Sequence, residues 1–588
     1  MTSSFDDHPA PSADPIPGRW AVVIILVVSL LAFFAGASGD IVKGDEVFHA
    51  GFARSWADAG LAHRPLCNPL YASGEAPGYY YGSEILWPFG LAALWQLAGE
   101  PHYSWIAQAY QALWFALLLT AIYLAGCQIG YKRYGLAALC IAASVPMFTA
   151  FSVLLYVDVP AAALATLAIL FLLHRQWFWA GVALALAYLT KRNAFFLAAP
   201  FFLWVCVEAA RAADSSAWRR RLAALAGALL FLAPILPTIA LDTLWRHNHL
   251  PHKADSGFSL NTILERLSPI NPLVLPSATH CLAGGLVLAL LLALAFILLR
   301  RARRAGPAAR AWTWTLILAV PVAALLLLKY SRLSLFSKQQ LPSNLTQPWD
   351  LITYLGPLLL VLILAYLLRR CWRNADRTDA WLAISLGLYV LIAITIFSID
   401  TDIRYLMPAI PLAILLAARA LAPWLNRPHF LAVLAIAAIL CSAGTAVFAR
   451  SQRLLTPSER EVFRYLRVVS PPGSLVLYPG EVVLAEANRP MVWAHILDQT
   501  TRRDSLHSLL FTDSPAEITD HLRFNGVAYV CLDRAHTSAA STINLIGGYP
   551  PSFVEKLHQA PGLEKLSGHW GDDIELFRVL PEDPKTTP

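Results

Sequence analysis

Charged residues are scarce in this sequence. Of its 588 residues, 14% are Asp, Glu, Lys or Arg, 57% are hydrophobic, and the mean hydropathy is +0.54. Soluble domains contain about a quarter charged residues, so this composition excludes an ordinary soluble protein and predicts a polytopic α-helical membrane protein. The net charge of +7 does not indicate nucleic-acid binding, because the basic residues form short clusters between apolar runs, as membrane loops do.

Metal-ligand motifs are also missing. The 8 cysteines form no CxxC pair and show no zinc-finger spacing, and most of them lie inside apolar runs. The sequence neither predicts nor excludes a disulfide between Cys67 and Cys281, because spacing alone cannot test it. His247, His249 and His252 have a spacing compatible with metal ligation, but no cysteine or carboxylate completes a recognisable set. We therefore expect no required cofactor, with a divalent metal as the open alternative.

Long apolar runs dominate the first three quarters of the chain. A run of about 17–20 apolar residues suffices to cross a bilayer as a helix. By this measure the sequence predicts about thirteen spans. They lie near residues 20–38, 104–127, 135–154, 158–173, 177–190, 194–210, 222–243, 281–299, 312–329, 350–368, 380–398, 405–423 and 429–449.

The basic clusters predict the orientation of these spans. With the N-terminus in the cytoplasm, the densest clusters, such as Arg219 to Arg221, fall in cytoplasmic loops, as the positive-inside rule requires. An odd number of spans then places the C-terminal part outside, as in the periplasm of a bacterium with this protein in its inner membrane. The expected divisions are a disordered cytoplasmic segment 1–18, a transmembrane domain 19–449 with a large first outer loop 39–103, and a periplasmic domain 450–588.

The C-terminal part has an ordinary soluble composition. Helix signals begin at Ser458 and cover 516–524 and 551–559, and strand signals cover 474–478, 527–531 and 574–579. This alternation predicts a small soluble α/β domain. It carries no nucleophile motif or phosphate-binding loop, which favours a scaffold or acceptor-contact role.

The first outer loop holds the leading candidates for catalysis. Asp45 and Glu46 follow the first apolar run closely, with His49 nearby. A carboxylate at a partly desolvated interface has a raised pKa and becomes a better general base. The alternative is a pair of solvated loop carboxylates. Further along come Tyr79, Tyr80 and Glu84, followed by an apolar stretch over 85–99 that is too short to span and predicts an interfacial or re-entrant helix.

Charged residues at three further outer turns are candidates for substrate binding. Asp158 is either a helix N-cap or a residue of the same outer cavity. Lys191 and Arg192 contact an anion such as a lipid phosphate, or they are headgroup anchors. Arg404 pairs with Asp402 or contacts a phosphate.

These residues stand in an order that resembles the GT-C superfamily of polyprenyl-phosphate-dependent glycosyltransferases. The resemblance covers roughly residues 20–425 and is greatest to the branch of protein O-mannosyltransferases and lipid A aminoarabinose transferases. It rests on Asp45-Glu46 after one anchor span, Pro77-Gly78-Tyr79-Tyr80 before a short apolar helix, then Asp158, Lys191-Arg192 and Arg404-Tyr405.

The resemblance implies a sugar donor linked to polyprenyl phosphate and presented at the outer leaflet. Lys191, Arg192 or Arg404 would meet the donor phosphate, and the polyprenyl tail would lie between spans, next to the membrane lipids. Transfer would proceed with inversion to a lipid, glycan or protein acceptor, with Asp45 as the proton acceptor. A transporter or lipid flippase is the competing interpretation, and a non-catalytic assembly protein is a third. Transporters commonly place charges near the bilayer midplane, whereas the charges here gather at the outer ends of spans.

Overall fold

The structure analysed is a computed structural model, and it describes part of the 588-residue chain. The described residues are 16–38, 44–61, 85–99, 104–213, 216–249, 356, 358–359, 361–363, 366, 377–396, 403–451, 455–471, 473–478, 491–492, 514–524, 526–533, 551–571 and 573–581.

The chain divides into two compact units, which are described separately. Unit 1 comprises Met1–Ala32, Gln111–Phe151 and Val157–Ala446, and unit 2 comprises Phe33–Tyr110, Ser152–Tyr156 and Val447–Pro588. Each unit is therefore built from three separate segments of the sequence, and no single position divides the chain into the two units.

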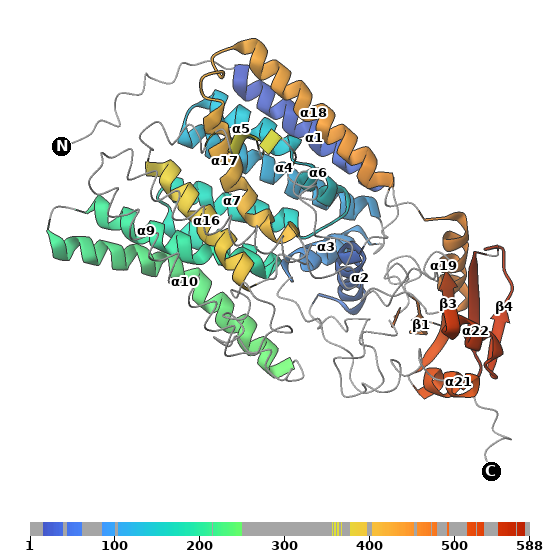
Figure 1. Ribbon diagram of the computed structural model, residues 1–588. Coiled ribbons are helices and arrows are strands. Elements are labelled where there is room, and N and C mark those ends of the chain that lie inside the picture. The colour runs from blue at the N-terminus through green and yellow to red at the C-terminus, as the bar shows by residue number, and fades with distance from the viewer. Residues whose placement is uncertain are drawn as a thin grey trace, which may run out of the picture. The chain divides into compact units, whose positions relative to one another are not determined.

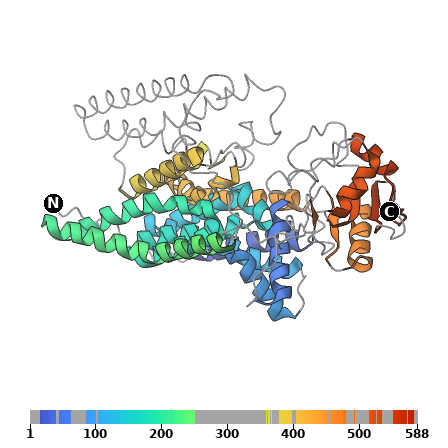
Figure 2. The same ribbon diagram turned by 90° about the horizontal axis from the view of Figure 1, so that it is seen from below.

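Helices make up the chain from residue 16 to residue 451 wherever it is described (Figure 1). They are α1 (Ile16–Ala37), α2 (Gly44–Ala59), α3 (Leu86–Ala98), α4 (Ser104–Ile129), α5 (Lys132–Ser144), α6 (Pro146–Val153), α7 (Asp158–Leu173), α8 (Trp177–Thr190), η3 (Arg192–Leu197), α9 (Ala198–Ala212), α10 (Ala217–His249), α16 (Arg377–Ile396), η4 (Ile403–Ala409), α17 (Ile410–Ala420) and α18 (Pro428–Ser451). In both views the long helices α9 and α10 lie side by side (Figures 1 and 2).

Five of these helices are long and apolar enough to cross a membrane, or up to six if a bent pair counts as one span, among the residues the structure describes. Helices also cover every other predicted span except 281–299 and 312–329, which lie outside the described residues, and 350–368, which lies mostly outside them. The count of about thirteen therefore stays a prediction.

The segment predicted as one span over 135–154 is bent by 61° between α5 and α6. Val145 is extended there, because the ring of Pro146 disfavours helical backbone in the residue before it. On α18, the hydroxyl of Ser442 donates to the carbonyl oxygen of Ala143 at 2.6 Å, beside the break. The apolar segment predicted over 135–154 is therefore present as two helices, which together are long and apolar enough for one broken span.

The C-terminal part of unit 2 contains a five-stranded sheet in the order β2-β1-β3-β5-β4. The strands are β1 (Leu475–Leu477), β2 (Met491–Val492), β3 (Val527–Asp533), β4 (Leu563–Leu566) and β5 (Ile574–Val579), with helices α19 (Pro457–Val469), α21 (Pro515–Phe524) and α22 (Pro551–Gln559). β1 pairs in parallel with β2 and β3, whereas β5 pairs antiparallel with β3 and β4. The six elements expected from the sequence in this part are all present.

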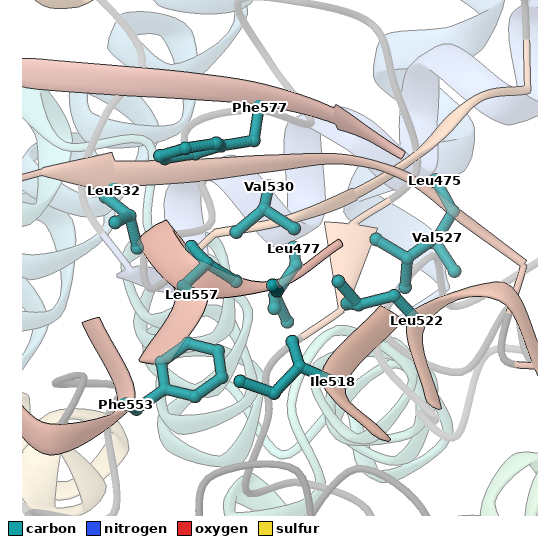
Figure 3. Packing of buried hydrophobic residues seen from close by; sticks show 11 residues of the cluster. Leu475, Leu477, Ile518, Leu522, Val527, Val530, Leu532, Phe553, Leu557 and Phe577 are labelled. Carbon is teal, nitrogen blue, oxygen red and sulfur yellow. The ribbon is translucent and has the colours of Figure 1, made fainter. Parts of the chain in front are cut away.

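One apolar cluster joins the sheet to two of these helices. Figure 3 shows Leu477 and Val530 of the sheet packed with Ile518 of α21 and Phe553 of α22. α19 begins one residue earlier than expected, because Thr456 is its N-cap and forms a reciprocal capping box with Glu459.

In unit 1, α4 and α5 approach closely at two glycines. A Cβ on Gly135 would lie 2.4 Å from Cys127 Sγ and 2.5 Å from the Tyr123 carbonyl oxygen, and one on Gly126 would lie 2.8 Å from Gly135 Cα. Small residues allow membrane helices to pack backbone against backbone. This close packing matters because the hydrophobic effect does not drive helices together in lipid.

We predict that Gly135→Ala lowers the thermal stability of the purified protein in detergent. The added methyl group has no space beside the Tyr123 carbonyl, so α4 and α5 must separate. Gly444→Ala on α18 is the matched control, because nothing lies within 4 Å of a Cβ there. It should leave the melting temperature unchanged or raise it slightly, since alanine favours helix. Equal melting temperatures for both variants would contradict the packing argument.

Candidate functional site

The acidic pair Asp45-Glu46 lies in a helix, where an irregular loop was expected. α2 begins at Gly44, which places both residues in its first turn. Glu46 and His49 are 0% and 2% exposed, so the interpretation of Glu46 as a solvated carboxylate was wrong. Buried positions recur at His49, Ala53 and Ala57, and this spacing of four is the signal that could have revealed the helix.

Aromatic contacts fix α2 against α3. The ring of His49 meets Trp87 with 6.3 Å between centroids, and Trp56 meets Phe89 at 4.9 Å. The side chain of Gln96 donates to the carbonyl oxygen of Ala57 at 2.9 Å. The predicted helix over 85–99 is therefore present as α3, and it supports the helix that carries the acidic pair.

A second group of candidates meets in unit 1. Lys191 Nζ lies 2.6 Å from Asp158 Oδ1, and the two side chains are 5% and 0% exposed. Asp158 is the first residue of α7 and makes no capping hydrogen bond, so the N-cap interpretation was wrong. Burial also rules out Lys191 as a headgroup anchor that reaches into water. The fold joins these residues from α7 and the end of α8.

Tyr405 on η4 organises the surroundings of this pair. Its carbonyl oxygen accepts hydrogen bonds from Asn193 Nδ2 at 2.9 Å and from the Tyr389 hydroxyl at 2.5 Å. Its ring lies 5.4 Å from Lys191 Nζ and 5.7 Å from the guanidinium carbon of Arg404. Sequence reasoning missed Tyr389, which no local pattern distinguishes from any other apolar position of α16.

Arg192 has a different carboxylate for a neighbour. Asp242, near the end of α10, accepts a hydrogen bond from the Tyr188 hydroxyl at 2.5 Å, and the charge of Arg192 acts on both groups. Lys191 and Arg192 are adjacent in the sequence, yet they interact with acids on different helices.

Three of the predicted residues thus form one cluster, which we call the Tyr405 cluster: Asp158, Lys191 and Arg404 around Tyr405. Among the residues that the structure describes, this cluster contains two cations and one carboxylate, so their summed formal charge is positive. A cluster with more cations than acids suits an anion, and arginine suits a phosphate in particular. Cation–π contact with Tyr405 adds to the positioning of both cations.

Other predicted residues lie outside what the structure describes. Tyr79, Tyr80, Glu84 and Asp402 are among them, and only the backbone of Asp45 is described. The side chains of the histidines near residue 250 are not described either. Among the described residues there is no group of three or more His, Cys, Asp or Glu that could hold a metal ion.

Comparison with known proteins gives this arrangement its context. Residues 85–240 match the family model described as dolichyl-phosphate-mannose-protein mannosyltransferase. The archaeal oligosaccharyltransferase AglB from Archaeoglobus fulgidus, in complex with an inhibitory peptide and a dolichol-phosphate, matches with a TM-score of 0.54 and 13% identity, over 97% of this chain and 75% of that one. No curated protein matches the sequence.

The fold is that of the GT-C glycosyltransferases. An Archaeoglobus fulgidus oligosaccharyltransferase tethered with an acceptor peptide gives a TM-score of 0.52 at 12% identity, over 89% of this chain and 69% of that one. ArnT from Cupriavidus metallidurans in the apo state covers 96% of this chain and 98% of its own at 16% identity, but a TM-score of 0.46 is too low to add to the argument. The resemblance to the GT-C superfamily is confirmed.

Removing one member of the buried pair should destabilise the protein strongly. Lys191→Ala leaves the Asp158 carboxylate without its cation at 0% exposure, and such changes cost about 3–5 kcal/mol. The double variant Asp158→Asn, Lys191→Gln should recover much of this loss, because no unpaired charge remains. Melting of the variants in detergent, followed by intrinsic fluorescence, measures the effect.

The exposed pair Glu461–Arg464 on α19 provides the control. Its side chains are 47% and 68% exposed, so Glu461→Gln should change stability by less than about 1 kcal/mol. A loss as large as that of Lys191→Ala would show that burial is not what makes the Asp158 pair important.

Proposed function

We propose that this chain is a membrane glycosyltransferase that moves a sugar from a polyprenyl-phosphate donor to a lipid, glycan or protein acceptor. One observation carries the proposal. The segment that matches the mannosyltransferase family model, 85–240, contains Asp158, Lys191 and Arg192, and the first two form the core of the Tyr405 cluster.

In this proposal the Tyr405 cluster receives the donor phosphate. Lys191 and Arg404 lie on the same aromatic ring and supply ammonium and guanidinium donors. As the sugar leaves, negative charge collects on the lipid phosphate, and fixed cations in a water-poor site stabilise that charge. Asp158 keeps Lys191 oriented while the site is unliganded. No metal is required for this step.

Asp45 is the proposed general base. It would take the proton from an acceptor hydroxyl as that oxygen attacks the anomeric carbon and the lipid phosphate departs, which inverts the configuration in a single displacement. An acceptor that is already an anion needs no base, and Asp45 would then position it. Glu46 and His49, both buried in α2, would hold the first turn of the helix in place.

The proposed orientation keeps the N-terminus in the cytoplasm of a bacterium and the chain after residue 450 outside. The transmembrane part 19–449 and the periplasmic part 450–588 remain the proposed domains. A topology reporter fused after Arg450 tests this, since activity on the cytoplasmic side would refute it.

Asp45→Asn should lower the rate of sugar transfer by about 10²- to 10⁴-fold, because it removes a general base while keeping the shape of the side chain. The assay is proteoliposomes given a panel of undecaprenyl-phosphate sugars and candidate acceptors. Asp58→Asn is the matched control. It removes one acid from the same helix, 13 residues after Asp45, and should retain activity.

The same assay distinguishes the competing function. A transporter or flippase would move the lipid-linked sugar across the bilayer without transferring it, and Asp45→Asn would leave that movement intact. Translocation without transfer would therefore overturn the proposal. Loss of transfer in the Asp58 variant as well would indicate damage to α2, not loss of a base.

A further inference from the structure

Helix α19 in unit 2 has two faces of opposite character. Val462, Phe463 and Leu466 are buried, and the ring of Phe463 packs on Tyr478 at the end of β1 with 5.6 Å between centroids. The apolar face of α19 therefore packs against the sheet. Only the opposite face can meet anything else.

That opposite face is a stripe of arginines. Arg460, Arg464 and Arg467 are all exposed, and Arg464 is 68% exposed. Residues four and then three positions apart lie on one side of a helix, so the three guanidinium groups share a face. Val468 continues this face at the end of the helix and is 73% exposed. We call these four residues the arginine stripe.

The arginine stripe follows a candidate membrane span closely in the sequence. The candidate span His429–Ser451 ends six residues before Pro457, where α19 begins. Six residues reach at most about 20 Å when fully extended. The start of α19 therefore cannot leave the neighbourhood of the membrane surface, whatever the path of the connection.

We propose that the arginine stripe is a docking surface for anionic phospholipid headgroups. Charge complementarity identifies the partner: three exposed arginines outnumber the one exposed acid beside them, Glu461, which lies 3.9 Å from Arg464. This net positive face, tethered beside a bilayer, suits lipid phosphates. The exposed Val468 suits the boundary between headgroups and acyl chains. This contact anchors the C-terminal sheet at the membrane surface, and it is independent of the proposed glycosyltransferase activity.

The test uses the full chain in nanodiscs and the modification of arginines by phenylglyoxal, read by mass spectrometry. In nanodiscs containing phosphatidylglycerol, modification of Arg460, Arg464 and Arg467 should be slowed at least about five-fold relative to nanodiscs of phosphatidylcholine alone, since one cation at an anionic surface contributes about a five-fold effect. Addition of 0.5 M salt, which shortens the screening length to about 4 Å, should remove the protection.

Arg578 is the internal control. It lies on β5 in the same unit, is 48% exposed and pairs with Glu564, so its rate should not depend on the lipid. The variant Arg464→Glu should reduce the protection of Arg460 and Arg467, because it places a negative charge in the centre of the stripe. The matched variant Lys556→Glu reverses a charge on α22 in the same unit and should leave their protection intact.

Two results would overturn the inference. Equal modification rates in the two lipids would show that the stripe faces water or another partner. Equal protection of Arg578 would show that the lipid shields the whole unit and not the stripe. Because none of these readouts uses sugar transfer, failure of the proposed function would leave them unaffected.

Discussion

The buried ion pair between Asp158 and Lys191 is the constraint on which unit 1 depends. A carboxylate that is 0% exposed is costly to bury without a cation, and Lys191 comes from the far end of the next helix. The pair therefore fixes the turn after α8 against the start of α7. η4 must then follow, because Asn193 in that turn holds the Tyr405 carbonyl. The same contacts that satisfy this buried charge therefore assemble the Tyr405 cluster.

Much of the fold follows from the sequence because its signals are local. Apolar runs predict the spans, and alternation of strand and helix signals predicts the elements around the C-terminal sheet. The helix over 85–99 follows from a run too short to cross a bilayer. The bend between α5 and α6 is different: Pro146 marks it, but the apolar run continues through it, so hydropathy alone predicts one span.

The site is less predictable, because its contacts join distant residues. Asp158, Lys191 and Arg404 are recognisable as charges at the ends of spans, but no sequence pattern shows that the first two neutralise each other. Tyr389 contributes only a hydroxyl to a backbone carbonyl and has no local signature. The helix α2 was hard to predict because several of its buried positions are alanine. Alanine is only weakly hydrophobic, so a helical spacing of alanines among charged residues gives little signal in the sequence.

The hydrogen bond at the break between α5 and α6 sets the register of α18. Lipid tails are as apolar as leucine, so they do not distinguish one rotation or depth of a membrane helix from another. Ser442 does, because its hydroxyl reaches the Ala143 carbonyl from only one position along the helix axis and one angle around it. A hydrogen bond beside the break in one helix thus positions another helix along its axis.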